Sequence, residues 1–224
     1  WETVARKLAH EIKNPLTPIQ LSIDSLRDKY KSKLTSDSQQ FEKYLETINR
    51  QIKDIEKLVN EFSNFARMPR PILKKINIKN LINQSLDFVK ISSKNKINFN
   101  IKTKYHFILG DEDQLNRVFM NLIKNSEESF LEKFKKDPNF KGNIDIEISD
   151  NNDYIVCRLI DNGPGITDTK KVMTPYFTTK KTGTGLGLPI VNKIINEHSG
   201  NFSIKNKSKG EGTLIKILLP KFNA

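Results

Sequence analysis

The stretch IVCRLIDNGPG, residues 155–165, joins an apolar run to a glycine-containing turn. The run 155–160 predicts a buried strand, because short apolar runs bounded by turn residues are typical of sheet cores. Gly163 and Gly165 allow the backbone to turn sharply and to approach a ligand closely. Asp161, at the end of the predicted strand, offers an acceptor that can hold an amine. Taken alone, the stretch fits an ordinary tight turn as well as a ligand site.

A second glycine-rich stretch, TGTGLGL at residues 182–188, leads into a helix predicted over 186–198. Glycines at alternate positions form a flexible cradle, and the N–H groups and dipole of a helix start favour a phosphate group. The stretch lacks the Lys-Ser/Thr ending of a P-loop, and its spacing differs from the dinucleotide-binding fingerprint. It therefore indicates a phosphate site of another type, with a mobile glycine hinge as the alternative.

Asn121 and Asn125 lie four residues apart within a helix predicted over 112–135. This spacing places both side chains on one face of the helix. An amide oxygen is a hard ligand suited to Mg²⁺, an ion that keeps most of its waters. A pair of solvent-facing amides is the alternative, and these two residues alone favour it.

The elements around these motifs predict the fold of the C-terminal part of the chain. Helices and strands in mixed order predict an α/β sandwich with the helices on one face of the sheet. Helices are expected over 78–92, 112–135 and 186–198, and strands over 97–101, 144–148, 154–160, 202–204 and 213–219.

The N-terminal part has a purely helical pattern. Apolar residues recur every three or four positions over 8–30 and, with heptad spacing, over 41–66. A polar segment at 31–38 separates the two helices, so they are expected to form an antiparallel hairpin. Because two helices bury too little apolar surface to stand alone, the hairpin is expected to dimerise into a four-helix bundle.

Pro69 and Pro71 end the second predicted helix, and the pattern changes there from heptads to short alternating runs. The predicted domains are therefore 1–70 and 71–224. The predicted fold class is α+β, with a helical hairpin that pairs into a four-helix bundle followed by an α/β sandwich.

The composition limits the class of protein. The chain has 224 residues, a net charge of +12 and one cysteine, and its sequence excludes a membrane span, a collagenous chain and a disulfide framework. Cys157 is expected to be a small core residue, which suits a reducing, cytoplasmic compartment. The lysines are scattered without a dense basic block, so nucleic-acid binding is not expected. The chain starts without Met or a signal peptide, and we expect it to be a piece of a longer protein.

His10 is the candidate nucleophile of the first helix. It lies two residues from both Leu8 and Ile12, about 200° around the helix from either, so its side chain points away from the apolar seam. A neutral imidazole can attack an in-line phosphorus, and the adjacent Glu11 can act as base or orienter. An exposed histidine is most often an ordinary surface residue. Pro15 argues against that interpretation, because it frees the carbonyl of Glu11 and loosens the helix just below His10.

The order of these motifs resembles the ATP-binding domain of sensor histidine kinases, within the wider family that includes gyrase and the Hsp90 chaperones. The resemblance rests on the asparagine pair, the Asp-x-Gly-x-Gly turn, Phe177 followed by TTK at 178–180, and the Gly-x-Gly-x-Gly stretch, and it covers residues 74–224. The run HEIKNPLTPIQLS is similar to the phosphoacceptor box of the same kinases. This run and EFSNFARMPRP look like the nitrogen-regulation branch of the family.

The resemblance implies a role for each site residue. Asp161 would hold the adenine amine of ATP, and Asn125 would ligate Mg²⁺ with Asn121 beside it. Gly163 and Gly165 would shape the adenine pocket. The other residues implied in nucleotide binding are Phe177, Lys180, Gly183, Thr184, Gly185, Leu186, Gly187 and Thr213, with Lys180 in a mobile lid over 167–183 and Thr213 at the end of the last glycine motif, GEGT at 210–213.

The resemblance also implies an ATP-dependent protein-histidine kinase that works as a homodimer. His10 would accept the γ-phosphate with help from Glu11 and pass it to an aspartate in the receiver domain of a response regulator. Asn14, one turn beyond His10, matches the position that orients water when the regulator is dephosphorylated. The parent protein is expected to be anchored in the inner membrane by segments upstream of this chain.

Asn121 separates the branches of the wider family. In the gyrase and Hsp90 branches, a Glu four residues before the Mg²⁺-binding Asn activates water, and Asn121 occupies that position here. Hydrolysis of ATP is therefore expected to be slow, which disfavours a chaperone-like ATPase. A phosphatase-dominant or regulator-docking module, in which ATP binding sets the conformation, is the alternative to the kinase.

Two residues depart from the family pattern. Ser126 stands where Ala is common, and Pro189 stands where a helix former is common. Neither is expected to change the function, and Pro fits a first helical turn. His106 and His198 have no partners at metal-ligand spacing and are expected to be structural.

Overall fold

The structure is a computed structural model that describes residues 2–34, 37–90, 93, 95–180, 183–207 and 212–222. The chain divides into two compact units. The first comprises Trp1–Pro69 with the short segment Lys180–Thr184, and the second comprises Arg70–Thr179 and Gly185–Ala224. None of the described helices has the length and apolar character needed to cross a membrane.

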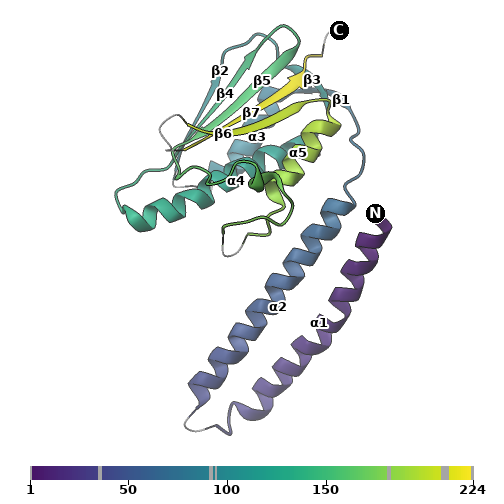
Figure 1. Ribbon diagram of the computed structural model, residues 1–224, viewed down its shortest axis with the longest axis vertical. Helices are drawn as coiled ribbons and strands as arrows, with labels where there is room; N and C mark the ends of the chain where they lie inside the picture. The colour runs from purple at the N-terminus through teal and green to yellow at the C-terminus, as the bar shows by residue number, and fades with distance from the viewer. Residues whose placement is uncertain are drawn as a thin grey trace. The chain divides into compact units, whose positions relative to one another are not determined.

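The first unit is a hairpin of two long helices, α1 (Glu2–Tyr30) and α2 (Ser38–Ala66), which lie antiparallel and side by side (Figure 1). Residues seven apart on each helix form the core of the hairpin, a spacing that the sequence predicts for α2. The members of this core are Leu16, Ile23, Leu45 and Ile52, with Phe41 packed against them.

A second apolar row on each helix is not buried in the hairpin. Six residues of the predicted seams are 42% to 44% exposed. Two packed helices share a single line of contact, so only one row of each seam packs within the chain. The other rows form a half-exposed surface that we call the hairpin stripe. It consists of Leu8, Ile12, Ile19 and Leu26 on α1 and Ile48 and Ile55 on α2.

The second unit is an α/β sandwich, as predicted. Its five-stranded sheet has the order β2-β4-β5-β7-β6, in which β2 and β4 are parallel and the other neighbours are antiparallel. Three helices lie on one face of this sheet (Figure 1). The strands are β2 (Lys96–Ile101), β4 (Asn143–Asp150), β5 (Tyr154–Asp161), β6 (Asn201–Asn206) and β7 (Thr213–Pro220). The helices are α3 (Ile78–Lys90), α4 (Glu112–Lys136) and α5 (Gly187–Glu197).

Alternate residues of the central strands form the core between sheet and helices. In β5 the buried alternate row includes Cys157 and Leu159 and ends at Asp161. Cys157 is a core residue, as predicted, and burial raises the pKa of its thiol to about 12. Because side chains alternate along a strand, the same row that builds the core carries the carboxylate of Asp161 inward.

Two short strands were not predicted. β1 (Lys74–Asn77) and β3 (Phe107–Gly110) form a separate antiparallel pair. Each strand has four residues, too few for a clear alternation of apolar and polar side chains. The predicted helix over 78–92 corresponds to α3, and residues 91 and 92 lie outside the described part of the chain.

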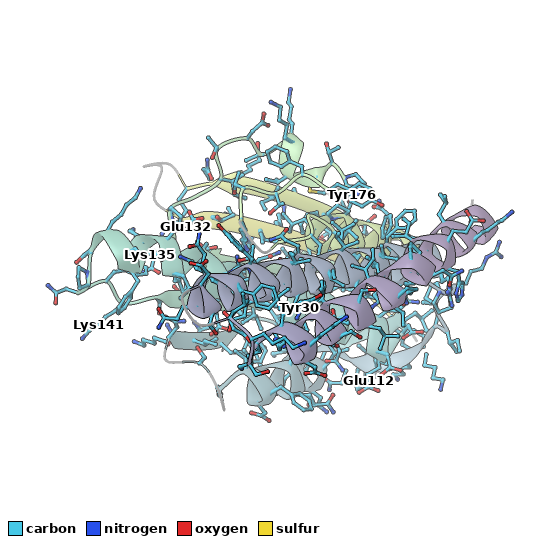
Figure 2. All side chains as sticks on the ribbon, turned by 90° about the horizontal axis from the view of Figure 1, so that it is seen from below. Tyr30, Glu112, Glu132, Lys135, Lys141 and Tyr176 are labelled. Atoms are coloured by element: carbon cyan, nitrogen blue, oxygen red, sulfur yellow. The ribbon has the colours of Figure 1, made fainter. Side chains whose placement is uncertain are left out.

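The ends of α4 differ in charge. Asp111 caps its N-terminus, where Glu112 and Asp113 also lie, and its last turn carries three lysines. Figure 2 labels Glu112 at the first end and Lys135 near the second. This distribution complements the helix dipole and stabilises the helix that carries the asparagine pair.

Candidate functional site

Asp161 is the last residue of β5, and both oxygens of its carboxylate are hydrogen-bonded. Oδ1 accepts from the backbone N–H groups of Gly163 (2.9 Å) and Thr213 (3.0 Å). Oδ2 accepts from the hydroxyl of Ser126 on α4, 3.1 Å away. Asp161 is 5% exposed. The carboxylate is therefore fixed in a buried position, where remaining acceptor capacity would select a donor group on a ligand.

Gly212 lies against the backbone of Asp161. Its φ is +88°, and a Cβ atom added there would lie 2.0 Å from the carbonyl oxygen of Asp161. Only glycine fits this approach, which brings the N–H of Thr213 to the carboxylate. Gly163 and Gly165 lie in the turn that follows Asp161, as predicted, whereas residues 210 and 211 of the predicted last glycine motif lie outside the described residues.

Asn121 and Asn125 are both half-buried on α4. The Nδ2 atom of Asn121 is buried, and it has no hydrogen-bond partner among the described residues. Asn125 faces the start of α5, since a Cβ atom added at Gly187 would lie 3.5 Å from its Nδ2 and 3.8 Å from its Oδ1. The structure thus brings the asparagine pair to the end of the glycine-rich stretch.

The start of α5 suits an anion. Leu186 occupies the N-cap position without a side-chain cap hydrogen bond. N–H groups in the first turn of a helix have no intrahelical partners, and those of Gly187 and Leu188 therefore favour a bound anion. Gly185 has a φ of +69°, and a Cβ atom there would lie 2.8 Å from the backbone nitrogen of Phe177. The preceding segment can therefore pass this close to the stretch only because Gly185 has no side chain.

The segment before the glycine-rich stretch is mostly irregular. It contains one short 3₁₀ helix, η1 (Lys171–Met173), and Tyr176, labelled in Figure 2, lies after it. Phe177 is half-buried, and its N–H donates to the carbonyl of Thr174 at 3.2 Å. Lys180, Gly183 and Thr184 group with the first unit, apart from Asp161 and Asn125 in the second. Residues 181 and 182 of the predicted lid lie outside the described residues.

His10 is exposed on α1, as the helix geometry predicts, while its neighbour Ala9 is 2% exposed. α1 continues as a helix through Pro15 and Pro18. Each proline removes one helix hydrogen bond and frees the carbonyl four residues earlier, that of Glu11 in the case of Pro15. His10 therefore lies on the solvent-exposed side of α1, and the helix lacks backbone hydrogen bonds in the turns that follow it.

Glu11 and Asn14 are also exposed. The carboxylate of Glu11 lies 3.8 Å from the ammonium group of Lys7, one turn earlier, and both side chains are largely solvent-exposed. Such a surface ion pair is weak, so it leaves Glu11 available to its neighbour His10. Asn14 follows His10 by four residues and shares its face of the helix.

His198 is a buried structural residue, as predicted. Its Nε2 accepts a hydrogen bond from the backbone N–H of Asp111 (2.9 Å), and its Nδ1 donates to the carbonyl of Ile194 (2.8 Å). The carboxylate of Asp111 accepts from the N–H groups of Ile72 (2.9 Å) and Gln114 (3.1 Å). Burial acts to raise the pKa of Asp111, but the hydrogen bonds from Ile72 and Gln114 oppose it, and the pKa is lowered.

The contact of Ser126 was not predicted. A hydroxyl next to Asn125 on a predicted helix was the available signal, but its partner Asp161 is 35 residues away in sequence. No group of three or more His, Cys, Asp or Glu side chains that could hold a metal ion occurs in the described part of the chain.

Two family models match the chain. The model of the histidine kinase-, DNA gyrase B- and HSP90-like ATPases matches residues 110–223. The model of the His Kinase A (phospho-acceptor) domain matches residues 1–71. The two matches correspond to the sandwich that contains Asp161 and to the hairpin that contains His10.

The chain is also similar to individual proteins. Nitrogen regulation protein NtrY of Azorhizobium caulinodans is 35% identical over 221 residues, which cover 98% of this chain and 28% of that protein. A sensor histidine kinase NtrY-like protein of Rickettsia prowazekii is 36% identical over 221 residues, which cover 97% of this chain and 35% of that protein. The solved structure of histidine kinase AdeS from Acinetobacter baumannii has the same fold, with a TM-score of 0.61 at 18% identity over 96% of this chain and 98% of that one.

Proposed function

The chain belongs to the sensor histidine kinases, and we propose that it transfers the γ-phosphate of ATP to His10 and then to an aspartate of a response regulator. One observation carries this proposal. A single chain combines an exposed histidine on a helix matched by the phospho-acceptor model with a buried, hydrogen-bonded carboxylate in the ATPase-like sandwich. In this proposal residues 1–70 dimerise and carry the phosphoryl group, and residues 71–224 bind ATP.

Asp161 is proposed to receive the adenine amine. Oδ1 already accepts two backbone hydrogen bonds, so the carboxylate can accept a further hydrogen bond at Oδ2. Gly163 and Gly165 are proposed to form the wall of the adenine pocket, because they follow Asp161 in the same turn. Thr213, at the start of β7, is proposed to form the floor of the adenine pocket, because its N–H donates to the carboxylate of Asp161.

The start of α5 is proposed to hold the phosphates. Its first N–H groups have no side-chain cap and the helix dipole favours negative charge there. Gly183, Thr184, Gly185, Leu186 and Gly187 are proposed to line this phosphate site, with Phe177 and Lys180 contributed by the preceding segment.

Magnesium fits the residues present. Asn125 supplies an amide oxygen, and its side chain faces the helix start where the phosphates are proposed to bind. The buried Nδ2 of Asn121 lacks a partner among the described residues, and it suits an acceptor such as a phosphate oxygen. We propose Asn125 as the magnesium ligand, and the bound ion would neutralise charge on the phosphates.

The transfer step uses His10 as nucleophile. A ring nitrogen attacks the γ-phosphorus and forms an N–P bond, while the bond from that phosphorus to the β–γ bridging oxygen breaks and ADP leaves. Glu11 is proposed to orient the ring or accept the proton from its other nitrogen. Asn121 stands where a carboxylate would activate water. Transfer of the γ-phosphate to His10 is therefore expected to be faster than hydrolysis of ATP.

A second copy of this chain is the proposed partner of the hairpin stripe. Six apolar side chains on two helices remain 42% to 44% exposed in one chain. Pairing two hairpins would bury this stripe and form a four-helix bundle. The receiver domain of an NtrX-like response regulator is the second proposed partner, on the strength of the similarity to NtrY.

A phosphatase-dominant activity is the second candidate function. Asn14 is exposed on the same face as His10, one turn beyond it, where its amide can orient water toward a phosphorylated regulator. In this alternative ATP binding sets the conformation and little phosphate passes through His10.

The test is incubation with γ-labelled ATP and Mg²⁺, comparing the chain with its His10→Gln variant. Label that requires His10, is lost in acid and is stable in base supports the kinase. Bound ATP without label on the protein contradicts the kinase. In that case, faster loss of phosphate from a phosphorylated regulator, abolished by Asn14→Ala, would support the phosphatase.

A further inference from the structure

Ser126 is a buried hydroxyl in direct contact with the proposed adenine partner. It follows Asn125 on α4, is 3% exposed, and donates to Oδ2 of Asp161 at 3.1 Å. A buried hydroxyl that lies this close to a carboxylate restricts both groups, because neither has water to exchange partners with. The hydrogen bond therefore affects what the carboxylate can offer to a ligand.

The acceptor sites of Asp161 can be counted. A carboxylate has about four lone-pair sites, two on each oxygen. Oδ1 uses both of its sites for the N–H groups of Gly163 and Thr213. Oδ2 uses one site for the hydroxyl of Ser126. Among the contacts of the described residues, one site, on Oδ2, is left for a ligand, and the Ser126 hydrogen bond determines which one it is.

The hydroxyl of Ser126 has a fixed direction. A hydroxyl carries one hydrogen, and an ionised carboxylate can only accept. Its hydrogen therefore points to Asp161, and its oxygen presents only lone pairs to any other group. Together, Oδ2 of Asp161 and Oγ of Ser126 form a buried pair that offers acceptors and no donor.

We propose that Ser126 is a positioning residue that orients Oδ2 of Asp161 and makes the site selective for a 6-aminopurine. An exocyclic amine supplies the N–H that the free site on Oδ2 requires. A 6-oxo group, as in guanine, would face lone pairs with no donor to meet it. This inference rests on the proposed role of Asp161 as the partner of the adenine amine.

The test measures the affinity of the 224-residue chain for Mg²⁺-ADP and for the analogue with hydrogen in place of the 6-amino group, purine riboside 5′-diphosphate. The ratio of the two dissociation constants gives the amine discrimination. We expect a ratio on the order of 100 for the wild type and about 10 for Ser126→Ala, because without the hydroxyl Oδ2 is no longer held toward the amine. A purely structural role would raise both dissociation constants equally and keep the ratio, which would overturn the inference.

Two further variants make the test specific. Ser129→Ala is the matched control, since the Ser129 hydroxyl donates to the carbonyl of Ser126 at 2.7 Å and has no hydrogen bond to Asp161 among the described contacts. It is expected to keep the wild-type ratio. Ser126→Cys keeps a weak donor of similar size and is expected to give an intermediate ratio. A Cys variant no better than Ala, with its fold intact by circular dichroism, contradicts the inference.

Asp161→Asn distinguishes a failure of the proposed adenine site from a failure of the proposed role of Ser126. If it leaves the amine discrimination at the wild-type value, Asp161 is not the adenine partner and the proposed adenine site fails. If it removes the discrimination while Ser126→Ala preserves it, the adenine site stands and the role of Ser126 fails. Loss of discrimination in Asp161→Asn together with a reduced ratio in Ser126→Ala supports the inference.

Discussion

Asp111 connects three parts of the second unit, and replacing it should destabilise that unit by a predictable amount. Its Oδ1 caps α4 through the N–H of Gln114, and its Oδ2 accepts the N–H of Ile72. Loss of an N-cap costs about 1 kcal/mol, and loss of one further hydrogen bond costs about 1 kcal/mol. Asp111→Ala is therefore expected to lower the free energy of unfolding by about 2 kcal/mol, or roughly 4–8 °C in transition temperature for a unit of about 150 residues.

Asp111→Asn separates the two hydrogen bonds. Its amide oxygen can still cap α4, but its NH₂ group cannot accept from Ile72, so the expected loss at pH 7 is about 1 kcal/mol. Burial acts to raise the pKa of Asp111 from its ordinary value of 3.8. The hydrogen bonds that its carboxylate accepts outweigh this effect and lower the pKa. The stabilisation by the ionised group is therefore present above about pH 4 and is lost as the pH falls through the lowered pKa. The difference between wild type and this variant should shrink on acidification.

Differential scanning calorimetry of the whole chain at pH 7 and at about pH 3 measures both effects. Asp113→Asn is the control, because Asp113 is exposed in the same first turn of α4 and tests the helix-dipole contribution alone. A transition temperature for Asp111→Ala equal to that of the control would refute the reasoning. So would a deficit in Asp111→Asn that stays constant between the two pH values.

Four other variants or probes test the remaining assignments. Asn125→Ala, which removes the amide oxygen, is expected to weaken Mg²⁺-ATP binding more than about 10-fold with the dimer intact in sedimentation. Unchanged affinity would contradict the proposed metal ligand. Gly212→Ala should destabilise the second unit by about 3 kcal/mol or more in urea titration, through its positive φ and the overlap with the Asp161 carbonyl; a wild-type midpoint would contradict this. Ile48→Glu should convert a dimer to a monomer in light scattering, whereas a persistent dimer would exclude the hairpin stripe as the interface. Burial raises the pKa of the Cys157 thiol from 9.0 to about 12, so the thiol should react with iodoacetamide on the order of 1000-fold more slowly in the folded chain than in urea. Equal rates would show that Cys157 is not buried.

The periodic elements could be predicted from the sequence because each carries its signal locally. The heptads over 41–66 indicate a helix with one apolar face, and the apolar run 155–160 indicates a buried strand. The structure has α2 and β5 at these positions. β1 and β3 could not be predicted, since four residues are too few for a period and each strand is stabilised by a partner about 30 residues away. Pairing across such a distance depends on the assembled unit and not on the residues of either strand.

The hairpin stripe shows a related limit. Apolar spacing identified the faces of α1 and α2 that avoid water, but it did not divide each face into the row that packs in the chain and the row that stays half-exposed. That division depends on the line along which the two helices touch, which is a property of their packing.

The sequence by itself determined the class of fold, the exposed His10 and the short motifs around Asp161, Asn125 and the glycine-rich stretch. Each of these is local, because helix periodicity and turn chemistry act over a few neighbouring residues. The tertiary structure alone decided that the Ser126 hydroxyl holds Asp161, that Asn125 faces Gly187, and that His198 accepts from the N–H of Asp111. These contacts join residues tens of positions apart, and a directional hydrogen bond forms only when folding has brought donor and acceptor within about 3 Å.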